Sequence, residues 1–193
     1  MKNVLSLFLI ASLFIAQNSF AQSPKHFEVS VIPGFATFST KHEQGMSLTG
    51  EFLYKFNRWV NPALRISSAS GFRGVDEGMG THQASLNALS LNACVDILGP
   101  KNKHAIQAGG GPGMNFEMYN YILGRFFAGE INREVNEIVA EGRFAFALNY
   151  FVRYRYRLSD HFLLGLEWSE SGLLTNGRVK QSALSFTFTA IAF

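Results

Sequence analysis

The sequence has few of the residues that build metal sites or disulfide frameworks. It contains one cysteine, Cys94, so no disulfide can form within the chain, and a lone cysteine is most simply a packing residue. The histidines and acidic residues show no metal-ligand spacing. Charged residues make up only 16% of the chain, and a net charge of +3 without a Lys/Arg run argues against a nucleic-acid partner. We therefore expect no metal, no cofactor and no nucleic acid.

Apolar and aromatic residues are abundant instead. Hydrophobic residues make up 47% of the 193 positions, with 19 phenylalanines against 2 tryptophans and 5 prolines. The charged fraction is below the roughly 25% usual in soluble domains. This composition indicates one β-rich domain that needs much apolar surface.

The N-terminus has the pattern of a secretory signal peptide. Lys2 precedes the apolar run "VLSLFLIASLFIA", and Ser19 and Ala21 are small residues at the positions a signal peptidase needs. The run is shorter than the roughly 20 residues of a membrane-spanning helix. We expect cleavage after Ala21, which makes 1–21 the signal peptide and 22–193 the exported domain.

Eight segments alternate between apolar and polar residues, as strands do. They cover about 26–39, 46–57, 60–72, 82–98, 104–115, 143–157, 161–169 and 181–193. Most have roughly 10–15 residues, whereas a tilted strand that spans a membrane needs about 9–11. Pro33 and Gly34 predict a bulge in the first segment, and the fourth changes phase near Ala88–Leu89.

The connections between these segments alternate in length. The short ones are at 57–60, 99–103 and 157–160, and the longer ones are at 40–45, 73–81, 116–140 and 170–180. Short turns at one end and long loops at the other are typical of outer-membrane barrels, with both termini at the periplasmic end. The predicted fold class is all-β, an eight-stranded antiparallel up-and-down transmembrane β-barrel.

The stretch 143–157, "RFAFALNYFVRYRYR", indicates which face points outward. Its large apolar side chains would overfill the narrow interior of eight strands, so we place them on lipid and the alternate residues inside. An arginine on lipid at mid-depth would cost about 2–4 kcal/mol. The predicted lumen charge network comprises Glu51, Lys55, Arg65, Asp96, Arg143, Arg153, Arg155 and Glu167. A salt-bridged plug and a narrow polar path both remain open, and Phe151 lies among the arginines without an evident partner.

Aromatic residues near the segment ends predict a girdle at each membrane interface. The girdle comprises Tyr54, Trp59, Tyr154, Tyr156 and Trp168. The alternative is that these are ordinary strand aromatics in a soluble sandwich.

The signal peptide, the eight segments, the turn "YRYRLSDHFLLGLEWS" and the terminal Phe193 together resemble the small outer-membrane β-barrel family of Gram-negative bacteria, of the porin-like type common in Bacteroidota. The resemblance implies outer-membrane localisation, contact with membrane lipid and lipopolysaccharide, and insertion by the barrel assembly machinery. It also implies a C-terminal assembly signal, for which Ile191 and Phe193 match and Thr187 and Thr189 do not. A bulge near Thr189–Ala190 would restore the pattern; otherwise the signal is imperfect.

Two sequence patterns could be mistaken for catalytic or nucleotide-binding sites. His82 and Ser85 are three residues apart on a strand, which puts them on opposite faces and about 10 Å from each other. The run "GGGPGMN" at 109–115 lacks the lysine of a phosphate-binding loop, and glycines here more simply permit close side-chain approach. We therefore expect no catalytic residues.

The segment 116–140 is too long for an ordinary hairpin connection. The spacing of Ile131, Val135, Ile138 and Val139 predicts a short amphipathic helix. This loop is where a surface ligand or lipopolysaccharide would bind, unless it is only a lid over the barrel mouth.

The sequence thus favours a non-enzymatic outer-membrane barrel with a structural or surface-interaction role through its loops and lumen. Three alternatives remain: a narrow porin or small hydrophobic-solute transporter, a barrel enzyme that modifies lipid A, and a secreted lipocalin-like carrier.

Overall fold

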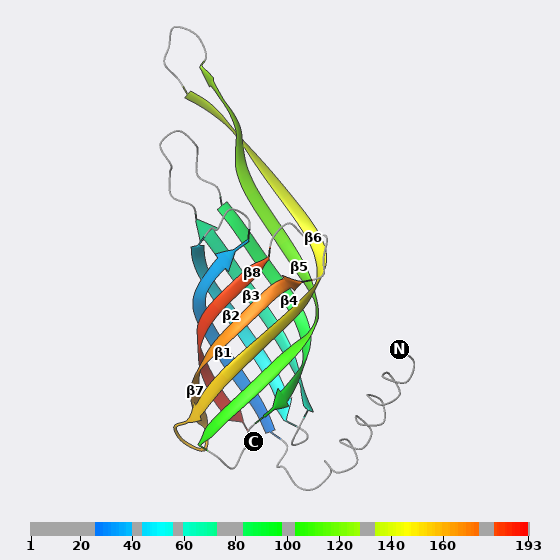
Figure 1. Ribbon diagram of the computed structural model, residues 1–193, viewed down its shortest axis with the longest axis vertical. Coiled ribbons are helices and arrows are strands. Elements are labelled where there is room, and N and C mark those ends of the chain that lie inside the picture. Colours follow the sequence, from blue (N-terminus) through cyan, green and yellow to red (C-terminus); the bar gives the residue numbers. More distant parts are fainter. Residues whose placement is uncertain are drawn as a thin grey trace, which may run out of the picture.

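The computed structural model describes residues 26–39, 44–55, 60–72, 83–97, 103–127, 134–173 and 180–192. They form one closed barrel in which each strand pairs with its sequence neighbours and β1 pairs with β8 (Figure 1). The strands are β1 (His26–Phe38), β2 (Gln44–Lys55), β3 (Val60–Phe72), β4 (Gln83–Asp96), β5 (His104–Phe127), β6 (Glu134–Arg157), β7 (Phe162–Leu173) and β8 (Gln181–Ala192). All pairs are antiparallel, which confirms the predicted fold class.

The two ends of the barrel differ in their connections. The β2–β3, β4–β5 and β6–β7 connections lie at the end where β1 begins and β8 ends, the lower end in Figure 1. The other four connections lie at the opposite end, as the alternation of connection lengths predicted. No helix in the described parts of the chain is long and apolar enough to cross a membrane.

The strands slant around the barrel axis (Figure 1). Following the paired residues once around the barrel from Tyr150 through Glu170 and Ser182 leads back to β6 at Ala140, a shift of ten residues. A stagger of this size accompanies a strand tilt of about 35–45° and an interior that side chains fill.

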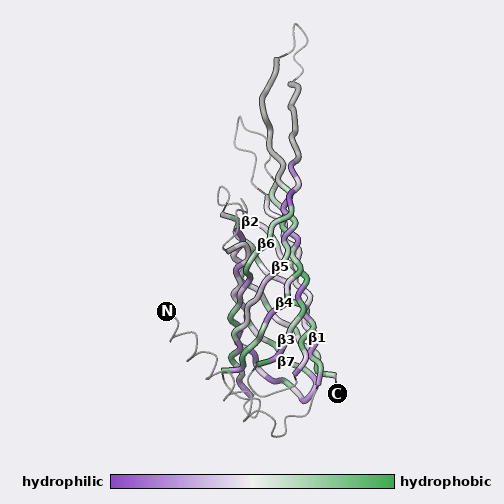
Figure 2. The backbone as a smooth tube through the Cα atoms, turned by 90° about the vertical axis from the view of Figure 1, so that its right-hand side faces the viewer, coloured by the Kyte–Doolittle hydropathy of each residue, from purple (hydrophilic) through white to green (hydrophobic). Residues whose placement is uncertain are grey.

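Exposed and buried residues alternate along the strands, and the apolar ones point outward. Phe146 is 78% exposed, Met46 71% and Phe35 67%, whereas Glu167 and Arg153 are each 1% exposed. The tube in Figure 2 accordingly alternates between hydrophobic and hydrophilic colours along the barrel strands. The apolar face of 143–157 therefore lies outside the barrel and its arginines Arg153 and Arg155 lie inside, as expected.

The segment 116–140 is not a loop with a helix, and that prediction is wrong. β5 continues to Phe127 and β6 begins at Glu134, with Tyr121 opposite Val139 and Ile122 opposite Ile138. The hairpin extends far above the barrel (Figure 1). Val135, Ile138 and Val139 are β-branched and favour strands. Their helix-like spacing misled the prediction because spacing within one segment does not show whether another strand pairs with it. A register shift between Ile122 and Arg125 absorbs the irregular apolar spacing.

Two predicted irregularities are absent. The β1–β2 register is continuous through Pro33 and Gly34, so β1 has no bulge there. β4 keeps one phase: Ala84, Leu86 and Ala88 point inward together with the polar residues that follow. The apparent phase change arose because the inward face of β4 is apolar at its upper end and polar at its lower end.

Candidate functional site

The lumen holds a buried cluster of four charged side chains that we call the upper quartet: Arg65, Arg153, Glu51 and Glu167. The Arg153 guanidinium donates to Glu51 Oε1 at 2.6 Å and lies 3.6 Å from Glu167 Oε2. Arg65 bonds to Glu167 and has its Nε 3.6 Å from Glu51 Oε2. Each arginine therefore contacts both carboxylates.

A second cluster, the lower quartet, lies at the short-turn end and comprises Lys55, Arg155, Glu28 and Asp96. Arg155 Nη1 donates to Glu28 Oε2 at 2.5 Å, and its Nη2 is 3.9 Å from Asp96 Oδ1. Lys55 donates to Asp96. Lys55 and Asp96 are the last residues of β2 and β4, which fixes the position of this cluster.

Gln107 joins the two quartets. Its Nε2 donates to Asp96 Oδ1 at 2.7 Å, and its Oε1 accepts from Arg153 Nε at 2.7 Å. Asn61 Nδ2 also donates to Asp96, at 3.4 Å. The charges and amides therefore form one continuous network through the lower half of the lumen.

Strand register brings these residues together. Asp96 is paired with Gln107, Gln107 with Arg153, and Arg153 with Glu167, so one row of neighbours crosses β4 to β7. Glu51 and Arg65 are likewise direct partners on β2 and β3. Residues opposite each other on adjacent strands have Cβ atoms about 4.5–5.5 Å apart, so such pairs can interact on the shared inner face.

Phe151 is the apolar centre of the upper quartet. The Arg65 guanidinium carbon lies 4.1 Å from its ring centroid and that of Arg153 lies 4.8 Å away, both within cation–π range. The ring is 2% exposed and packs with Leu53, Ala63 and Cys94. Phe151, which lies inward among the arginines, thus contacts two guanidinium groups and three apolar side chains.

The network has balanced charge. The two quartets contain four cations and four carboxylates, each 7% exposed or less. A buried charge is tolerated when it is paired and hydrogen-bonded, and an unpaired one is costly. In the described part of the chain, no group of three His, Cys, Asp or Glu could hold a metal ion.

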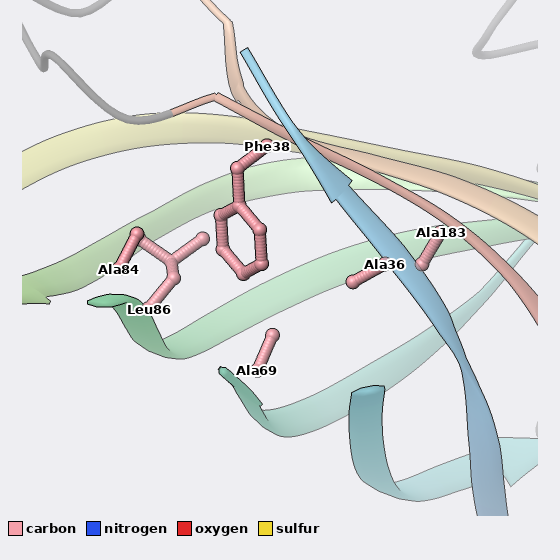
Figure 3. Packing of buried hydrophobic residues seen from close by; sticks show 6 residues of the cluster. All are labelled: Ala36, Phe38, Ala69, Ala84, Leu86 and Ala183. Atoms are coloured by element: carbon pink, nitrogen blue, oxygen red, sulfur yellow. The ribbon is translucent and has the colours of Figure 1, made fainter. Parts of the chain in front are cut away.

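The opposite end of the lumen holds a cluster of buried apolar side chains (Figure 3). The Phe38 ring, which is 0% exposed, lies over Leu86 and Ala84 and near Ala69. Ala36 and Ala183 complete the cluster. Because Phe38 ends β1 and Ala183 lies near the start of β8, the cluster lies at the long-loop end.

A small polar cavity is lined partly by the upper quartet. Its lining includes Arg65, Phe151, Thr49, Ser90 and Asn149. Water centres can occupy about 30 Å³ of it, which is enough for only one or two molecules. The described lumen therefore contains charged side chains, a little free polar space and an apolar cluster.

The structure places the sequence-predicted lumen residues as follows. All but one lie in the two quartets; the exception is Arg143, which is exposed and lies beyond Leu148, where β6–β7 pairing ends. Arg143 has the same parity as the inward residues of β6, but β7 no longer pairs with β6 at its level, so its side chain is exposed. That part of the prediction is wrong.

Sequence reasoning missed Glu28 and Gln107. Glu28 alternates with the outward residues Phe27 and Val29, so strand parity could have identified it. Gln107 lies in a glycine-rich segment with uncertain register, and only strand pairing shows its place beside Arg153.

Of the other predicted site residues, Ile191 points inward, and the rest lie on the outer face or outside the described residues. Tyr54, Tyr154, Tyr156 and Trp168 all have the outward phase, and Trp59 and Phe193 lie outside the described residues. The β8 register runs without a bulge through Thr189 and Ala190, so Ile191 points inward at 8% exposure. Ser85 has the outward phase on β4, and His82 lies outside the described residues.

Comparison with known proteins shows similarity in structure and not in sequence. No family model matches this chain and no curated protein does. Neisserial surface protein A is similar with a TM-score of 0.58 and 12% identity, over 85% of this chain and 96% of that one. The attachment invasion locus protein of Yersinia pestis is similar with a TM-score of 0.53 and 13% identity, over 88% and 99%.

A third similar structure is the N-terminal β-barrel domain of Pseudomonas aeruginosa OprF. Its TM-score is 0.52 with 13% identity, over 88% of this chain and 99% of that domain. At these identities the similarity concerns the fold alone. The chain therefore has the fold of the small eight-stranded outer-membrane β-barrels.

Proposed function

We propose that this protein is a non-enzymatic outer-membrane barrel whose lumen is closed and whose β5–β6 hairpin acts as a surface-interaction element. The charge-balanced network that fills the lower lumen carries the proposal. A closed lumen leaves the outer face and the projecting hairpin as the surfaces available to partners.

The lumen contacts support a plug over a path. Arg65 and Arg153 are each held by Glu51, Glu167 and the Phe151 ring, so a passing solute would have to break several buried contacts at once. Separating one buried partner from such a pair costs about 3–5 kcal/mol. The apolar cluster around Phe38 would block the other end.

The hairpin supports a surface role. β5 and β6 are each 24 residues long, against 12 to 14 for the other strands, and their ends project above the barrel (Figure 1). Strand pairing makes the projection a two-stranded hairpin and not an irregular loop. The attachment invasion locus protein, which shares the fold, has a structure in complex with a heparin analogue, sucrose octasulfate.

From the sequence we also propose cleavage after Ala21 and recognition of Ile191 and Phe193 by the assembly machinery. The same proposal includes contact with lipopolysaccharide and the porin-like type common in Bacteroidota. Amino-terminal sequencing of the membrane-inserted protein tests the cleavage site directly.

The surface role is tested by shortening the hairpin. Replacing 121–139 with a two-residue turn removes the projection and leaves the β4–β5 and β6–β7 ladders intact. Cells displaying the full protein should bind immobilised sulfated polysaccharide or matrix protein above the empty-vector level, and cells with the shortened protein should not. Equal binding by both, at matched surface amounts of heat-modifiable barrel, would contradict the role of the hairpin.

The narrow porin is the second candidate, because the polar cavity beside Arg65 borders the network. A measurable single-channel conductance would favour the porin, and no conductance would favour the plug. A lipid-A-modifying activity would require changed lipid A masses in a deletion strain.

A further inference from the structure

A carboxylate lies on the outer face of the barrel, where apolar residues dominate. The outward residues of β7 run Phe162, Leu164, Leu166, Trp168 and then Glu170. Trp168 is flanked by Val152 and Leu184 on the adjacent strands, all three more than 40% exposed. Glu170 thus lies one row above an apolar row, at the upper end of the apolar outward residues of β7 and β8, while those of β6 continue to Phe144.

Two hydroxyl groups hold this carboxylate in place. Tyr150 donates to Glu170 Oε2 at 2.5 Å, and Ser182 donates to Oε1 at 3.3 Å. Register makes Tyr150 and Ser182 the direct neighbours of Glu170 on β6 and β8. A carboxylate has about four acceptor sites, so each oxygen keeps capacity for a further donor.

No described cation balances the charge of Glu170. None of the ion pairs formed by described residues includes it. The outward residues of β6 to β8 include no Lys or Arg between Phe144 and Tyr156, Phe162 and Glu170, or Ser182 and Ala190. Lys180, which precedes β8, is exposed and makes no ion pair with it. No described residue supplies the balancing charge, so the carboxylate can accept a cationic group from outside the barrel.

The surrounding rings indicate the chemistry of that partner. The rings of Tyr150, which lies beside Glu170, and Trp168, which lies in the row below, meet edge to face with centroids 5.4 Å apart. Aromatic rings beside a carboxylate favour an ammonium group, because ring faces attract cations. A divalent ion prefers six or more oxygen ligands and would find a single carboxylate here. A headgroup with phosphate alone would be repelled.

We propose that Glu170, Tyr150, Ser182 and Trp168 form a binding site for lipids whose headgroup carries an ammonium group. The ammonium group lies against the Glu170 carboxylate and the aromatic rings, and the acyl chains lie along Trp168 and Leu184. The inference rests on the proposed membrane placement of the barrel.

Quenching of Trp168 by brominated lipids tests the site. Trp59→Phe leaves Trp168 as the single tryptophan, since the chain has 2. The protein is placed in phosphatidylglycerol nanodiscs that contain a small fraction of acyl-brominated phosphatidylethanolamine or phosphatidylglycerol. The ethanolamine lipid should be enriched at Trp168 by at least about threefold, the size of an exposed cation–π or ionic contact.

Variants separate the site from general lipid packing. Glu170→Gln should abolish the enrichment, Tyr150→Phe should reduce it, and Asp160→Asn at the exposed β6–β7 turn should leave it unchanged. Equal enrichment of phosphatidylcholine would support an ammonium site that also takes quaternary amines. Enrichment that survives Glu170→Gln, its absence in the parent protein, or its loss on adding EDTA would overturn the proposal. Failure to form a heat-modifiable barrel in nanodiscs would instead refute the membrane placement.

Discussion

At the scale of single residues, Phe151 shows how an apolar ring can belong to a charged interior. The ring fills the space between the Arg65 and Arg153 guanidinium groups and is itself 2% exposed. Phe151→Ala should therefore reduce the free energy of unfolding by about 3–5 kcal/mol. Phe151→Leu, which keeps most of the volume but loses the ring face, should cost less. Equilibrium urea unfolding in lipid vesicles measures both, and an alanine variant as stable as the parent would contradict this packing.

Glu167 provides a charge test of the same interior. Glu167→Arg would place a third guanidinium beside Arg65 and Arg153 and remove one of their two carboxylates. We expect a loss of at least about 3 kcal/mol in unfolding free energy, since a broken buried pair leaves an uncompensated charge. Asp160→Arg makes the same change of charge at the exposed turn and should be nearly neutral. Equal effects of the two variants would show that the inward pairing does not matter.

At the scale of elements, the glycines of β5 make room for the lumen contents. A Cβ on Gly109 would come within 2.7 Å of Phe151 Cε1 and 3.1 Å of Cys94 Sγ. Gly109→Ala should therefore displace the ring and cost about 1–3 kcal/mol. On the neighbouring Gly110, which faces outward, a Cβ would meet the Asn149 carbonyl oxygen at 3.1 Å and the Tyr150 Cβ at 3.3 Å, so Gly110→Ala should cost less. Vesicle unfolding of the two variants side by side checks the order, and the reverse order would rule out this reason for the glycine run.

The same elements show what sequence could predict. Alternation located all eight strands and the outward faces of most of them, because period-two patterning directly reflects an inner and an outer surface. It could not identify the β5–β6 projection, since the pairing of Tyr121 with Val139 is not visible in the local spacing of either strand. It also misread β4, because an apolar residue such as Leu86 fits inside the lumen where Phe38 lies nearby.

The lumen charge network could be predicted only in part, because the sequence shows which face a residue is on but not which residues it meets across strands. Parity along single strands placed Glu51, Arg65, Arg153 and Glu167 inside, which made their meeting plausible. Which carboxylate meets which guanidinium depends on register between strands, and that is set by all the pairs together. Arg143 shows the limit of parity: it has the inward phase but lies where β7 no longer pairs with β6.

At the scale of the whole molecule, the barrel combines an apolar outer surface with two interior quartets whose charges balance. The upper and lower quartets link the strands from inside, while the outward residues form the apolar surface on which the proposed membrane placement rests. The two surfaces proposed to bind partners are the outer face around Glu170 and the β5–β6 hairpin.

Single-channel recording in planar lipid bilayers tests the closed lumen most directly. The refolded protein is first shown to be inserted as a barrel by its heat-dependent mobility on gels. The account predicts no reproducible unitary conductance from the inserted protein at any applied voltage that the bilayer withstands. Regular conductance steps of constant size would contradict it and would show that Arg65, Arg153 and Arg155 border a path through the barrel.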